Sequence, residues 1–83
     1  MTKLESLLPA YAKAEPQSEY SPLVTIMCRK NIKFSDEQQL LKKFRKYNLL
    51  IEKSGPGEYM LRPSDGSSRD ILMDYIWRYF KDK

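Results

Sequence analysis

The sequence predicts a small α+β domain in which three helices are followed by a β-hairpin and a C-terminal helix. Two observations carry this prediction. Residues 35–47 have apolar side chains at helical spacing, and residues 49–62 alternate apolar and polar side chains around a Ser-Gly-Pro-Gly turn. Helical spacing indicates an amphipathic helix, whereas period-two alternation on both sides of a turn is typical of a hairpin. With 83 residues, the chain is expected to form a single domain.

The first helix is expected over residues 2–14. Thr2 and Glu5 have the spacing of a capping box, in which each side chain bonds the other residue's backbone. Pro9 is expected to kink or divide this helix, since proline interrupts the helical hydrogen bonds. Its apolar stripe consists of Leu4, Leu7, Leu8 and Tyr11.

The second helix is expected over residues 21–31. Ser21 suits the N-cap and Pro22 the first helical position. Arg29 and Lys30 suit the C-terminal end of the helix dipole. A β-strand over Val24–Met27 is the competing interpretation, because Val-Thr-Ile is β-branched. The apolar stripe that favours the helix consists of Leu23, Val24, Met27 and Cys28.

The third helix, over residues 35–47, has two chemically different faces. Ser35 and Gln38 have the spacing of a capping box, and Asp36 and Glu37 suit the positive end of the helix dipole. One face is apolar and comprises Leu40, Leu41, Phe44 and Tyr47. The opposite face comprises Gln38, Gln39, Lys42, Lys43, Arg45 and Lys46. We expect the apolar face to form the core together with Leu49, Ile51, Tyr59 and Leu61.

The last helix is expected over residues 67–81, with Ser67 as its N-cap. Its apolar arc covers about 240° of the helix, whereas packing on one core needs a little over about 100°. The surplus predicts a homodimer through this helix. The expected interface comprises Ile71, Leu72, Met73, Ile76, Trp77, Tyr79 and Phe80.

Composition narrows the classes of function. Fifteen basic and 11 acidic residues give a net charge of +4, which permits an anionic partner. The chain has no histidine, one cysteine and no Gly-rich phosphate loop. We therefore expect no enzyme, cofactor, metal site or intrachain disulfide. Cys28 is expected to be a small buried apolar residue. The absence of a long apolar run predicts no signal peptide or membrane span and an intracellular protein.

The run LLKKFRKYNLLIEKSGPGEYMLRPSDG resembles the end of a winged-helix domain. The resemblance covers Ser35–Gly66 well and the first two helices loosely. It implies a small winged-helix transcriptional regulator that binds double-stranded DNA with the 35–47 helix in the major groove and the hairpin as its wing. It also implies DNA contacts by Gln38, Gln39, Lys42, Lys43, Arg45, Lys46 and, from the wing, Lys53.

Three other interpretations remain open. The same fold could be a protein-interaction module that uses the aromatic C-terminal helix. The lysines could be ordinary residues of a solvent-facing helix. RNA binding is a weaker alternative, because no stacking platform of exposed aromatic residues is evident. Strong salt dependence of binding to duplex DNA would favour the DNA interpretation.

Overall fold

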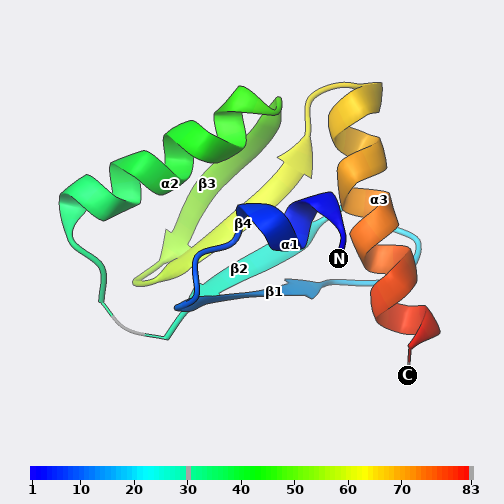
Figure 1. The fold of residues 1–83 in the computed structure, drawn as a ribbon, viewed down its shortest axis with the longest axis horizontal. Helices are drawn as coiled ribbons and strands as arrows, with labels where there is room; N and C mark the ends of the chain where they lie inside the picture. Colours follow the sequence, from blue (N-terminus) through cyan, green and yellow to red (C-terminus); the bar gives the residue numbers. More distant parts are fainter. Residues whose placement is uncertain (30, 83) are drawn as a thin grey trace.

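A four-stranded antiparallel sheet with three helices on one side forms the fold in the computed structural model, which describes residues 1–29 and 31–82 (Figure 1). The strands are ordered β1-β2-β4-β3 across the sheet. In chain order the elements are α1 (Lys3–Leu7), β1 (Ala12–Pro16), β2 (Val24–Cys28), α2 (Phe34–Lys46), β3 (Leu49–Gly55), β4 (Glu58–Pro63) and α3 (Gly66–Lys81).

The first predicted helix is real but much shorter than expected. Thr2 caps α1, and the capping box with Glu5 is confirmed. The helix ends at Leu7, two residues before Pro9, and the chain continues as β1. The prediction of a helix to residue 14 is therefore wrong. A proline at this position ends a helix readily because it cannot donate the next hydrogen bond.

The prediction of a second helix over residues 21–31 is wrong, and the competing interpretation of a strand is correct. Val24–Cys28 is β2, in which Val24 and Ile26 are buried. Ser21 caps no helix here. The Ser18 hydroxyl instead accepts from the backbone N–H groups of Tyr20 and Ser21 in a turn. Lys30, at the expected end of that helix, lies outside the described residues.

The hairpin is not a separate wing, because β4 pairs with β2 on one side and β3 on the other. The two central strands pair Val24 with Leu61 and Ile26 with Tyr59. This pairing places the buried strand residues on one face of the sheet, where the helices cover them. The order of helices and strands thus differs from the order that the winged-helix resemblance implies, although the small α+β class is correct.

α2 and α3 match the ranges expected for the last two helices to within one residue at each end, but their caps differ from expectation. α2 begins at Phe34 after the N-cap Lys33, which makes no side-chain cap. Ser35 therefore lies inside the helix. Asp65, and not Ser67, caps α3 through a capping box with Ser68.

One apolar core joins the sheet to all three helices. Leu40 and Phe44 of α2 lie over the sheet, and Leu72 and Ile76 of α3 are fully buried. Six of the expected core residues are buried, whereas Leu41 and Tyr47 are partly buried at its rim. α1 contacts α3, and the Tyr75 hydroxyl donates to the Ala14 carbonyl of β1 at 2.6 Å.

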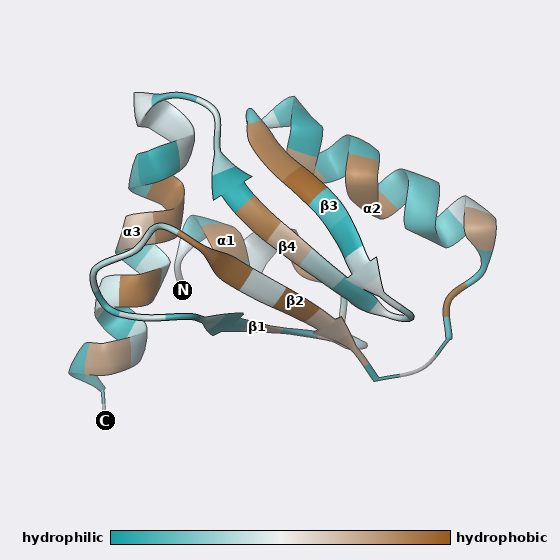
Figure 2. Cartoon of the chain, turned by 180° about the vertical axis from the view of Figure 1, so that it is seen from behind, coloured by the Kyte–Doolittle hydropathy of each residue, from teal (hydrophilic) through white to brown (hydrophobic). Residues whose placement is uncertain are grey.

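No helix of residues 1–29 and 31–82 lies on the opposite face of the sheet (Figure 2). Its side chains are of mixed polarity and include the exposed Leu50 and the partly exposed Thr25, Met27 and Met60. Two ion pairs lie on this face, between Lys13 and Glu15 at 3.2 Å and between Arg62 and Glu52 at 3.0 Å.

Candidate nucleic-acid interface

The outward side of α2 carries four cations within five residues. Lys42, Lys43, Arg45 and Lys46 are all exposed, as are Gln38 and Gln39. Because successive residues turn by about 100°, Lys42 and Lys46 lie roughly opposite the buried Leu40 and Phe44. Among residues 1–29 and 31–82, none of the four cations has a carboxylate within ion-pair distance. We call these four cations with Gln38 and Gln39 the α2 face.

Of the two carboxylates in the first turn of α2, Glu37 lies away from the outward side. Glu37 turns toward the sheet, where its Oε2 accepts from the Tyr59 hydroxyl at 2.5 Å and lies 3.0 Å from the Lys53 ammonium. Its hydrogen bond with Tyr59, together with Lys53, lowers the pKa of Glu37. Burial and the contact with Glu37 raise the pKa of Tyr59. Asp36 is exposed and lines a cavity on the same flank of the helix as Gln39 and Lys43.

Lys53 does not join the α2 face. Its side chain lies on the helix-covered side of β3 and pairs with Glu37 at the N-terminal end of α2. The exposed cations Lys42–Lys46 lie at the other end of the helix. The turn after Lys53 leads into β4 of the central sheet. The structure thus brings together six of the seven residues expected to contact DNA.

Lys3 adds a positive charge at the C-terminal end of α2. Its ammonium lies 4.4 Å from the centre of the Tyr47 ring, and the Lys46 ammonium lies 6.0 Å from the same ring. Such cation–π contacts hold an ammonium over an aromatic face without neutralising its charge. Sequence reasoning missed Lys3, because nothing in the pattern of residues 1–7 indicates that α1 lies beside the end of α2.

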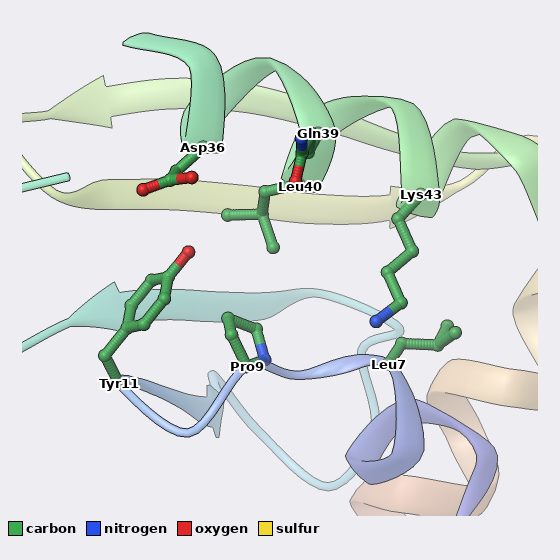
Figure 3. Close-up of a pocket in the computed structure, with 7 residues that line it drawn as sticks. All are labelled: Leu7, Pro9, Tyr11, Asp36, Gln39, Leu40 and Lys43. Atoms are coloured by element: carbon green, nitrogen blue, oxygen red, sulfur yellow. The ribbon is translucent and has the colours of Figure 1, made fainter. Parts of the chain in front are cut away.

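A cavity of about 120 Å³ lies between α2 and the connection from α1 to β1 (Figure 3). Its α2 residues recur at helical spacing, so they share one flank. In Figure 3 the Tyr11 hydroxyl points toward Asp36, and the Lys43 side chain extends toward Leu7. Burial and the charge of Asp36 raise the pKa of Tyr11. The lining residues are Leu7, Pro9, Tyr11, Asp36, Gln39, Leu40 and Lys43.

Cys28, which was expected to be a small buried apolar residue, is only partly buried at the end of β2, where it packs against the core. Burial raises the pKa of its thiol, and the nearby charge of Glu37 raises it further. A raised pKa keeps the thiol protonated at neutral pH and disfavours nucleophilic chemistry.

The expected dimer surface on α3 divides between the core and solvent. Leu72 and Ile76 belong to the core of one chain. Trp77 is 63 % exposed, and the Lys81 ammonium lies 4.6 Å from the centre of its ring. Tyr79 and Phe80 pack edge to face at 5.3 Å between ring centres. Ile71, Met73, Tyr79 and Phe80 are partly buried.

Comparison with protein-family models, curated proteins and solved structures gave no match to this chain. Within the described part of the chain, no group of carboxylate, cysteine or histidine side chains could hold a metal ion. No helix there is long and apolar enough to cross a membrane.

Proposed function

We propose that the protein binds double-stranded DNA without catalysis, through the α2 face, as a small transcriptional regulator. The observation that carries the proposal is the cluster of exposed cations on this helix, which have no carboxylate partner among the residues that the structure describes. The DNA-binding part of the proposal stands on this cluster, whereas the role as a transcriptional regulator rests on the winged-helix resemblance.

Charge separation on α2 supports the proposal. A cationic face binds nucleic acid poorly where carboxylates stand among the lysines, because those carboxylates repel phosphate. Here Glu37 turns inward to Tyr59 and Lys53, so that of the two carboxylates in the first turn only Asp36 stays exposed, on the flank that it shares with Gln39 and Lys43. Lys3 extends the positive surface beyond the end of the helix.

The dimensions of α2 also support the proposal. A helix of 13 residues is about 20 Å long, and the major groove of B-DNA, about 12 Å wide, admits one helix. Leu40 and Phe44 fix the inner side of α2 on the sheet, so the outward side is presented rigidly. Lysine and arginine side chains would contact phosphates, and the amides of Gln38 and Gln39 could bond base edges.

The direct test is fluorescence anisotropy of a labelled mixed-sequence duplex at several salt concentrations. Neutralisation of four phosphates predicts that log K falls against log salt with a slope of about −3.6. A Lys42→Ala, Lys46→Ala double variant should bind more weakly and reduce the magnitude of that slope by about 2.

The matched control is a Lys13→Ala, Lys81→Ala double variant, which loses the same charge from β1 and α3. It should keep most of the wild-type affinity. Equal losses in both variants would mean that only net charge matters, and no binding at low salt would refute DNA binding.

A protein-interaction module is the second candidate, favoured by the exposure of Trp77. A large aromatic residue at the surface is a common anchor of protein interfaces. A complex with one cellular protein that resists salt and is lost in Trp77→Ala would favour this candidate.

A further inference from the structure

We propose that the cavity between α2 and the α1–β1 connection binds an unpaired guanine base. The proposal rests on the proposed DNA binding, since the base would belong to the nucleic acid that the α2 face holds. A free guanine nucleotide offers the same chemistry and is distinguished by the experiment below.

The size of the cavity limits its occupant to one ring system. Pockets that enclose drug-sized ligands have volumes of about 300–1,000 Å³, whereas this cavity has about 120 Å³. Leu7, Pro9 and Leu40 give it apolar surface suited to the faces of a flat ring. The polar side chains that also line the cavity, among them Asp36 and Gln39, would contact the edge of such a ring.

Those polar groups match the edge of guanine. An ionised Asp36 only accepts hydrogen bonds, so it selects a ring with N–H donors. Guanine presents two donors side by side, its ring N1–H and its N2 amino group, next to the O6 acceptor. A carboxylate can accept from both donors at once, and the amide of Gln39 can donate to O6.

Lys43 connects the cavity to the α2 face, because its side chain lines the cavity and Lys43 is also one of the four cations of that face. A base in the cavity would therefore place its own phosphate near a cation. In a duplex the same edge of guanine is occupied by cytosine, so the base must be unpaired, as in a bulge. Recognition of unpaired bases through this edge is the usual route to sequence specificity in single-stranded segments.

The experiment compares duplexes that carry one bulged nucleotide, either guanine, adenine, cytosine, thymine or an abasic site. Anisotropy should show the guanine bulge bound about tenfold more tightly than the abasic one. Asp36→Asn should remove this preference, because an amide cannot accept from both donors. The ratio of the two affinities is the readout, so the general effect of a lost negative charge cancels.

Asp74→Asn on α3 is the control, and it should keep the ratio. Circular dichroism checks that each variant folds. Gln39→Ala is a second cavity variant, which is expected to lower the ratio of the two affinities and serves as the test if Asp36→Asn does not fold. Equal ratios in wild type and both cavity variants would overturn the proposal.

Guanosine and adenosine monophosphates form a separate arm, followed through the backbone amide NMR signals of residues 36–43. Shifts with the guanine nucleotide alone, in a protein that binds no duplex, would support the cavity and refute the DNA proposal. Binding of duplexes with no base preference and no nucleotide shifts would overturn the cavity proposal and leave DNA binding intact.

Discussion

Two residues of the β3–β4 hairpin have a positive φ, which favours glycine and asparagine: Asn48, just before β3, and Gly57, in the turn between the strands. Asn48 has φ 63° and Gly57 has φ 70°. Asparagine tolerates this left-handed region better than most residues, and glycine enters it without strain. Asn48 is also held by its side-chain amide, which donates to Asp65 at 3.0 Å.

Gly57→Ala should destabilise the fold by about 1–2 kcal/mol, because an alanine Cβ is unfavourable at a positive φ. The space itself is adequate, since an added Cβ would lie 3.6 Å from the Cys28 carbonyl oxygen. Urea denaturation measures the change. Gly66→Ala is the control, since nothing lies within 4 Å of its Cβ and it begins α3. An equal loss in both variants would contradict backbone strain as the cause.

The bond between Glu37 and Tyr59 should make stability depend on pH in the acidic range. The pKa of Glu37 lies below its ordinary value of 4.5, so its ionised form is favoured by folding. Its contribution is fully present above that ordinary value and is lost as the pH falls through the lowered pKa. Glu37→Gln should therefore flatten the fall in urea midpoint between neutral pH and about pH 3.

Glu52→Gln is the matched control for this pH dependence. Glu52 lies on the open sheet face with a side chain that is 70 % exposed, so its ion pair with Arg62 should contribute little. If both variants kept the wild-type slope, Glu37 would have no special part in acid stability.

At the level of single residues, the sequence predicts the α2 face well but not its surroundings. Periodicity alone separates Lys42 and Lys46 from Leu40 and Phe44, because a helix turns regularly. The cavity joins Tyr11 to Asp36, and the cation–π contact joins Lys3 to Tyr47. These are contacts between distant segments, which no local pattern encodes.

Among the elements, α2, the hairpin and α3 were predicted, β2 was predicted only as the competing interpretation, and β1 was missed. The predictable elements are long or carry a strong turn signal, so local preference and tertiary packing agree. β1 and β2 have five residues each, and the apolar residues around them fit a helix as well as a strand. Their state is decided by pairing with each other and with β4. The alternation of Val24 and Ile26 with Thr25 and Met27 was the signal available.

Phe44→Ala should test how firmly α2 is held on the sheet. Removing a fully buried phenylalanine costs about 3–5 kcal/mol, a large part of the total of about 5–15 kcal/mol for a small domain. Thermal and urea unfolding should show a strongly destabilised or unfolded protein. Lys42→Ala on the same helix should change stability by less than about 0.5 kcal/mol. If Phe44→Ala were as stable as Lys42→Ala, the packing of α2 on the sheet described above would be contradicted.

At the scale of the whole molecule, self-association through α3 stays a prediction, and it now depends on fewer residues. The core already uses Leu72 and Ile76, so a homodimer would be centred on Trp77 with the partly buried aromatic residues beside it. We expect sedimentation equilibrium to show a concentration-dependent dimer, which Trp77→Ser should weaken at least tenfold without loss of folding. Wild-type protein that sediments as a single chain at all concentrations would contradict it.

The strand order has a consequence for how the chain acquires its shape. Each pair β1–β2 and β3–β4 is a hairpin between neighbouring segments, and within the described residues only the β2–β4 pairing joins the two halves of the sheet. Local hairpins form within about 1–10 μs, whereas pairing between distant strands must first overcome the entropy of closing a long loop. Folding should therefore be limited by the meeting of two preformed hairpins, and substitutions along the β2–β4 seam should slow folding more than equally buried substitutions elsewhere.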